Sequence, residues 1–95
     1  MATILVRHKV KDYAKWKSVF GSVDSFHKKN GVKSVQIMKN ADNPNELVIL
    51  SEFENISAAR KFAESEELKQ VMQRAGVADK PDIYFLEKAS SKNFS

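Results

Sequence analysis

The feature that most constrains the fold is a run of four consecutive apolar residues, 47–50, within the segment 46–54 (ELVILSEFE). Side chains of a β-strand point alternately to the two faces of a sheet, so an uninterrupted apolar run buries side chains on both faces. We therefore predict that residues 46–54 form a central strand. Both faces of its sheet must then be covered, either by the chain itself or by a partner.

Three other segments are typical of strands. In residues 3–10 the apolar side chains fall mainly on one parity, whereas residues 82–88 are apolar on both parities. Residues 32–40 form another candidate strand, and the following residues 41–45 (ADNPN) have the composition of a turn. We predict that this turn joins two strands of an antiparallel hairpin.

A long amphipathic helix is predicted between the first two strands. Aromatic and apolar residues recur at three- and four-residue steps over residues 13–27, and Asp12 has the short acceptor side chain of an N-cap. Gly31 is suited to end the helix, because glycine readily adopts the left-handed conformation of a C-terminal cap. Gly21 in the interior indicates either close packing or a bend.

A second helical region is predicted between residues 54 and 81. Asn55 or Ser57 can cap a short helix, and Ser65 can cap a second piece that ends at Gly76. The inward-facing residues of the two pieces follow helical spacing. They are Ile56, Ala59, Phe62, Ala63, Leu68, Val71, Met72 and Ala75.

The predicted order is β-α-β-β-α-β, a ferredoxin-like α+β fold with both helices on one face of a four-stranded antiparallel sheet. We predict that residues 1–88 form a single domain and that residues 89–95 form a polar tail. Phe94 gives this tail one side chain that could dock onto a partner chain.

The helix-free face of the sheet predicts a homodimer. Leu5, one parity of residues 47–50, and Ile83 or Phe85 would form an exposed apolar patch larger than monomers usually carry. Pairing two such faces buries the patch. We expect Arg7, which falls among these positions, to be paired with a carboxylate such as Glu52 or Glu87.

Composition narrows the class of protein. The chain has 95 residues, no cysteine and a net charge of +4 from scattered lysines, so we expect no disulfide, no thiolate metal site and no nucleic-acid partner. The first residues carry too few apolar side chains for a signal peptide, and no segment is long enough to span a membrane. We expect a cytoplasmic protein.

Several motifs together carry a resemblance to a known family. The motifs are VRHKV (6–10), DYAKWK (12–17), NADNPNE (40–46), ARKFA (59–63), MQRAGV (72–77) and PDIYFL (81–86). With them the chain resembles the dimeric α/β-barrel superfamily, and it is especially similar to small proteins grouped with the antibiotic biosynthesis monooxygenases, many of which have no assigned activity.

The resemblance implies a dimeric α/β barrel but not a substrate. The superfamily includes cofactor-independent oxygenases of polycyclic phenols, haem-degrading enzymes, isomerases and chlorite dismutases. The asparagine, tryptophan and histidine set of the haem-degrading branch has no match, because neither histidine follows the second helical region. No cofactor is therefore expected.

His8 is the first candidate for chemistry, because its parity places an imidazole between sheet and helices. A neutral imidazole could serve there as a general base. The simpler interpretation is a core histidine bonded to Asp12 or Tyr84. His27, among lysines near a helix end, is interpreted as a surface residue, and two histidines so far apart do not indicate a metal site.

Five residues could line a pocket for an aromatic ligand between sheet and helices, although ordinary core packing explains them equally well. They are Trp16, Phe20, Phe62, Met72 and Tyr84. Two functions stay open: a dimer that binds a small aromatic molecule or is purely structural, and a cofactor-independent monooxygenase or isomerase acting on a phenolic substrate. In the second, His8 would accept a proton, Tyr84 would hold an oxygen and Trp16 would stack on the ring.

Overall fold

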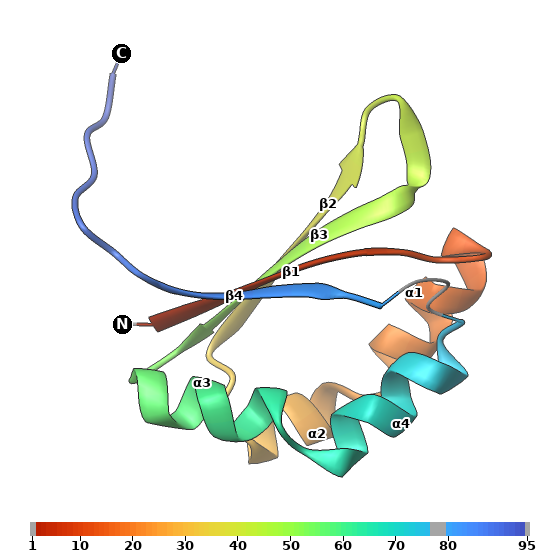
Figure 1. The fold of residues 1–95 in the computed structure, drawn as a ribbon, viewed down its shortest axis with the longest axis horizontal. Coiled ribbons are helices and arrows are strands. Elements are labelled where there is room, and N and C mark those ends of the chain that lie inside the picture. Colours follow the sequence, from red (N-terminus) through yellow and green to blue (C-terminus); the bar gives the residue numbers. More distant parts are fainter. Residues whose placement is uncertain (1, 77–79, 95) are drawn as a thin grey trace.

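The computed structural model describes residues 2–76 and 80–94; Met1, residues 77–79 and Ser95, which belong to the predicted domain and tail, lie outside the described residues. The described chain forms a four-stranded sheet in the order β2-β3-β1-β4, with every neighbouring pair antiparallel. Its helices all lie on one side of this sheet (Figure 1). The ferredoxin-like prediction is confirmed.

The elements follow the predicted order, with two helical segments in each connection. They are β1 (Ala2–Lys9), α1 (Tyr13–Gly21), α2 (Asp24–Lys29), β2 (Ser34–Asn40), β3 (Asn43–Phe53), α3 (Ile56–Ala63), α4 (Glu66–Arg74) and β4 (Asp82–Glu87). The apolar run at 47–50 lies in β3, which pairs with β1 on one side and β2 on the other, as a central strand should. No described helix is long and apolar enough to cross a membrane.

The hairpin turn is tighter than its composition predicts. Only residues 41–42 connect β2 to β3, so Pro44 lies inside a strand rather than in the predicted turn. This strand position tolerates proline because β3 pairs with β1 only from Glu46 onward. The pairing with β2 is also irregular there, between Lys39 and Asn40. Side-chain bonds of Asn40 and Asn43 to nearby backbone amides hold the turn.

The prediction of a single long helix over 13–27 is wrong, because the helix is interrupted between Gly21 and Asp24. A Cβ added at Gly21 would meet no atom within 4 Å, so close packing does not explain this glycine. The break follows from its poor helix propensity and from Ser22, whose hydroxyl donates to the Val19 carbonyl at 2.6 Å. A bend, one of the two predicted readings of Gly21, is what occurs.

The helix ends are set by local chemistry, as predicted. Asp12, Asn55 and Ser65 cap α1, α3 and α4 by accepting backbone N–H groups at 2.9, 2.9 and 3.2 Å. Gly31 and Gly76 follow α2 and α4 with φ of 82° and 76°, the left-handed conformation that glycine adopts without strain.

The hydrophobic core fills the space between the sheet and the helices. It contains the even-numbered residues of β1, the odd-numbered residues of β3 and the inward faces of α1 and α3. Its most buried large side chains are Phe53 and Leu47, both on β3. One layer of the core therefore comes from the sheet and the other from the helices.

The helix-free face differs from the prediction in one strand. Val6 and Ile4 pair with Ile83 and Phe85, so both of these β4 residues lie on the helix side. Tyr84 and Leu86 take the outer positions instead. Because β4 is apolar on both parities, the hydrophobic pattern alone could not decide between them. We call the apolar surface of this face the outer patch: Leu5, Met38, Val48, Leu50, Tyr84 and Leu86.

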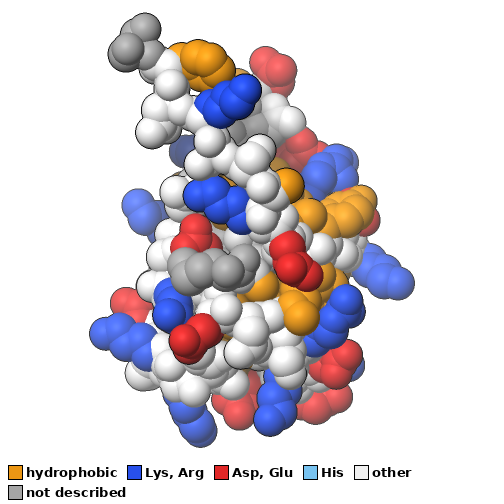
Figure 2. Space-filling view, turned by 90° about the vertical axis from the view of Figure 1, so that its left-hand side faces the viewer, with side chains coloured by type: hydrophobic (Ala, Val, Ile, Leu, Met, Phe, Trp, Pro, Cys, Tyr) orange, Lys and Arg blue, Asp and Glu red, His pale blue; other side chains and the backbone are white. Residues whose placement is uncertain are grey.

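The segment after β4 leaves the sheet on the side opposite the helices (Figure 1). In space-filling view it projects from the body of the molecule, above a surface on which charges of both signs alternate (Figure 2). Phe94, near its end, is 90% exposed. The predicted docking of Phe94 onto a partner stays a prediction.

Candidate functional site

A small cavity lies between the sheet and the helices, with a volume of about 50 Å³. Its walls are almost entirely apolar, and every helix contributes to them. The side chains that matter for chemistry are His8, Trp16, Phe20, His27, Phe62 and Met72. The cavity as it stands is too small for an aromatic ring, since an engineered cavity that binds benzene measures about 150 Å³.

His8 occupies the sheet side of this cavity and is 4% exposed. Among the described residues, neither of its ring nitrogens has a hydrogen-bond partner. The predicted bond to Asp12 or Tyr84 is absent, because Asp12 caps α1 and Tyr84 lies on the other face of the sheet. Burial lowers the pKa of His8 below its ordinary 6.5, so the ring is neutral at pH 7. A buried neutral imidazole without partners can accept a proton or bind a ligand hydroxyl.

The indole of Trp16 meets His8 edge to face, with ring centroids 5.9 Å apart. It is also stacked on Phe20 at 4.9 Å and, less closely, on Tyr13 at 6.1 Å. Trp16 therefore already has stacking partners, so a ligand ring must displace one of them to stack on the indole. Trp16 is therefore part of a stacked aromatic cluster beside His8.

His27 is not the surface residue that the neighbouring lysines suggested. Its ring packs against Phe20 and Phe62, with centroids 4.9 and 5.9 Å apart, and it lines the same cavity as His8. His27 Nδ1 lies 3.0 Å from the Val23 carbonyl, which can only accept, so Nδ1 is the donor. In the neutral ring Nε2 is then a free acceptor. The sequence held the signal, because His27 continues the apolar stripe of Phe20 and Val23.

The structure brings together five of the six predicted site residues. His8, Trp16, Phe20, Phe62 and Met72 line the cavity, whereas Tyr84 belongs to the outer patch and is 56% exposed. The expectation that Tyr84 lies between sheet and helices is wrong. Their predicted roles in binding or catalysis stay predictions.

A second hollow adjoins the cavity on the outside, between α4 and the start of β4. We call it the α4–β4 groove; it has a volume of about 330 Å³. Four residues line both hollows: Ala63, Leu68, Met72 and Ile83. The two hollows therefore share part of their walls.

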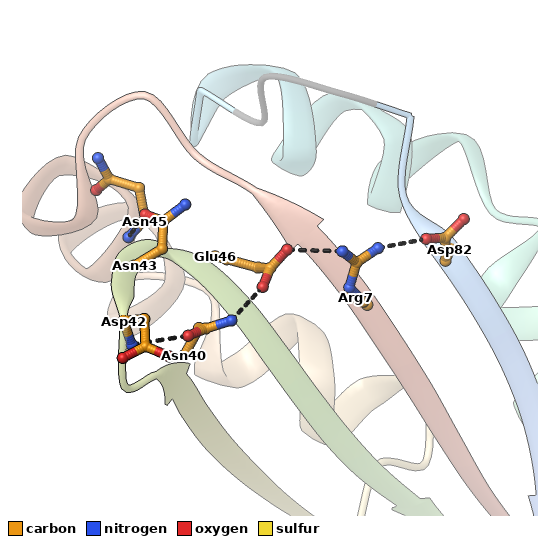
Figure 3. Close-up of polar contacts among 7 residues, drawn as sticks. All are labelled: Arg7, Asn40, Asp42, Asn43, Asn45, Glu46 and Asp82. Atoms are coloured by element: carbon orange, nitrogen blue, oxygen red, sulfur yellow. Dashed lines mark hydrogen bonds and ion pairs between the residues drawn. The ribbon is translucent and has the colours of Figure 1, made fainter.

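A polar cluster borders the outer patch at one end (Figure 3). Arg7 lies between two carboxylates, with Nη2 2.7 Å from Glu46 and Nη1 2.9 Å from Asp82. Asn40 donates a further hydrogen bond to Glu46. This bond, followed by the Arg7 charge, lowers the pKa of Glu46, while Glu46 raises the pKa of Arg7. The predicted pairing of Arg7 with a carboxylate is confirmed, with partners other than Glu52 or Glu87.

The sequence model of one protein family, described as antibiotic biosynthesis monooxygenase, matches residues 6–74. The chain belongs to this family. The match spans all four helices, β2 and β3 in full, and β1 from Val6 onward. No curated protein sequence matches the chain.

Solved structures of antibiotic biosynthesis monooxygenases share the fold. A Bordetella bronchiseptica protein named as a candidate member is 12% identical with a TM-score of 0.80, covering 94% of this chain and 97% of the other. SnoaB, a cofactor-independent oxygenase from Streptomyces nogalater, is 16% identical with a TM-score of 0.77, covering 95% and 94%. A conserved protein from Methanosarcina mazei is 15% identical with a TM-score of 0.73, covering 92% and 91%. At these identities the likeness shows the fold alone.

Proposed function

We propose that this member of the antibiotic biosynthesis monooxygenase family is a cytoplasmic homodimer that binds a planar aromatic molecule between sheet and helices. The observation that carries the proposal is His8, whose two buried ring nitrogens lack partners in a largely apolar wall, where the other polar side chains are His27 and Ser51. An unsatisfied buried polar group is costly, so a ligand hydroxyl that bonds it gains both affinity and orientation.

The ligand would need more room than the cavity alone provides. The cavity near His8 measures about 50 Å³ and the adjoining α4–β4 groove about 330 Å³. The two share part of their walls, and Leu68 and Met72 come from α4, of which no residue is fully buried. Rotation of these flexible side chains, with a small shift of α4, would join the two hollows into a site of ordinary ligand size.

The second candidate function is cofactor-independent oxygenation of that ligand. It is favoured by a neutral imidazole in a dry pocket, and one structural neighbour, SnoaB, is described as a cofactor-independent oxygenase. His8 would take a proton from an acidic C–H of a phenolic substrate. The resulting carbanion would reduce O₂ and bond to it as a peroxide; loss of the second hydrogen from the same carbon then breaks the O–O bond, so that a CH₂ group and O₂ become a carbonyl and one water, with both protons of the water coming from that CH₂. Tyr84 has no part in this scheme, because it lies outside the pocket.

The homodimer is proposed from the outer patch. Its residues come from all four strands, and Met38, Tyr84 and Leu86 are 50%, 56% and 41% exposed. Pairing two copies face to face would bury them against each other, and apolar burial contributes about 25 cal/mol per Å². An RNA-binding role is disfavoured, because Phe53, the only aromatic residue of β3, is fully buried on the helix side.

A binding titration tests the ligand site. The neutral fluorophore N-phenylnaphthylamine should bind one per protomer and raise the Tm, and Met72→Trp, which fills the wall between cavity and groove, should abolish both effects. Lys17→Gln on the exposed face of α1 is the control. Unchanged binding by Met72→Trp, with its circular dichroism intact, would place the probe elsewhere and overturn the proposal.

Two further measurements test the other parts. With anthrone as substrate, oxygen uptake by the native protein should be lost in His8→Gln; equal uptake removes His8 from the reaction. Sedimentation should give a dimer for the native chain and a monomer for Leu50→Glu. Ser57→Glu, which adds the same charge on the helix side, should remain dimeric, and a monomeric native chain at micromolar concentration would refute the dimer.

A further inference from the structure

The α4–β4 groove is apolar where it meets the cavity and cationic at its outer end. Ala63, Leu68, Met72 and Ile83 form the inner part, which is shared with His8's cavity. The remaining lining residues are Lys69 and Gln73 from α4, and Lys80 and Pro81 before β4. A molecule lying along the groove would therefore meet carbon and sulfur at one end and ammonium groups at the other.

The charge at this outer end is positive and weakly compensated. The described lining residues include two lysines, one amide and no carboxylate. Lys69 Nζ lies 3.5 Å from Glu66 Oε1, but these side chains are 64% and 80% exposed. Exposed ion pairs of this kind contribute little, so Lys69 can exchange Glu66 for a ligand group at small cost.

We propose that the ligand of this site is an aromatic acid, with its ring beneath the sheet near His8 and its carboxylate or sulfonate at Lys69 and Lys80. This inference rests on the proposed ligand-binding function and adds the charge of the ligand to it. The compact ammonium groups can bind an anion that stays partly hydrated at the groove mouth, while the ring replaces water in the apolar part. A positive mouth also accelerates the encounter with an anion.

Two fluorophores that differ by one anionic group separate this inference from the proposed function. Anilinonaphthalene sulfonate and N-phenylnaphthylamine share the same ring system, but only the first carries a sulfonate. Anilinonaphthalene sulfonate should bind the native protein about five- to tenfold more tightly than N-phenylnaphthylamine does, as expected for two exposed ion pairs. Its advantage should shrink as ionic strength rises, whereas the affinity of the neutral probe should not fall.

The lysines themselves provide the decisive variants. Lys69→Gln combined with Lys80→Gln should remove the preference for the sulfonate and leave the affinity for the neutral probe unchanged; Lys17→Gln is the matched control and should change neither. Equal affinities of the native protein for both probes, both lost in Met72→Trp, would overturn this inference alone. Failure of both probes to bind would overturn the proposed function as well.

Discussion

Arg7 and Asp82 lie directly opposite each other on β1 and β4, with Arg7 Nη1 2.9 Å from Asp82 Oδ2. The apolar pattern leaves this register open, because β4 carries apolar residues on both parities, and the pair forms in the register observed. A shift of one residue would exchange the two faces of β4 and place Arg7 opposite Pro81 or Ile83. We therefore expect the ion pair to favour the register in which Tyr84 faces outward.

Asp82→Ala should weaken this choice of register. We expect the Tm to fall by only a few degrees, since the pair is exposed, while cross-strand NMR contacts between Leu5 and Tyr84 weaken or double. Glu87→Ala on the same strand is the control and should leave those contacts unchanged. Sharp, undoubled contacts in Asp82→Ala would show that packing alone fixes the register.

Glu46→Gln should make the free energy of unfolding depend less on pH in the acidic range. Because the Asn40 bond and the Arg7 charge lower the folded-state pKa of Glu46 below its ordinary 4.5, its ionised form stabilises the fold above that value. This contribution is lost as the pH falls through the lower folded-state pKa. Denaturant unfolding should show the native protein as more stable at pH 6 and the two as equal near about pH 2. Glu52→Gln serves as the control, and a gap independent of pH would contradict the expectation.

His8→Phe should stabilise the protein most at acidic pH. The folded-state pKa of His8 is below 6.5, so the unfolded chain takes up a proton first as the pH falls, and the native protein loses stability below about pH 6.5. Phenylalanine takes up no proton. It also leaves no unsatisfied buried nitrogen, and the cost of such a group, about 1–3 kcal/mol, is removed. The unfolding free energy of His8→Phe should therefore exceed that of the native protein by more at about pH 5 than at pH 7.5. Parallel pH profiles would mean that the fold does not lower the pKa of His8.

His27 should be found as a single neutral tautomer. The 3.0 Å contact from Nδ1 to the Val23 carbonyl requires the proton on Nδ1 and leaves Nε2 bare. Two-bond ¹⁵N–¹H correlation spectra recorded in alkaline buffer should show this pattern for His27. A proton on Nε2, or rapid averaging of both forms, would remove His27 from any proton-accepting role in the cavity.

Asn55→Ala should destabilise the protein by about 1 kcal/mol, because it removes the side chain that accepts the Ala58 N–H at the start of α3. Ser57→Ala, which changes the other residue able to cap this helix, should have an effect close to zero. The comparison by chemical unfolding is clean, since both positions are exposed. A larger loss in Ser57→Ala would reverse the assignment of the cap.

The sequence predicted best what local chemistry determines. The apolar run at 47–50 required a central strand, and Asp12 and Ser65 identified two helix starts, because a capping side chain acts on amides only two or three residues away; for the third, the structure selects Asn55 over the alternative Ser57. His8 and four of the five pocket residues were placed correctly for the same kind of reason. Their periodicity alone assigns them to the buried face.

Features that depend on partners distant in the sequence were predicted less well. Tyr84 was misplaced because the face it occupies depends on how β4 pairs with β1, at the other end of the sequence. The environment of His27 depends on α3, which brings Phe62 over its ring. The break at Gly21 depends on two weak effects, the poor helix propensity of glycine and the Ser22 hydrogen bond. Hydrophobic periodicity reports neither of them.

The narrow wall between the cavity and the α4–β4 groove bears on kinetics. Since the void beside His8 is about 50 Å³, a ring can enter only after Leu68 and Met72 have moved aside. The association rate measured by stopped flow should then not rise in proportion to ligand concentration. At high concentration it should level off at the rate at which the wall opens.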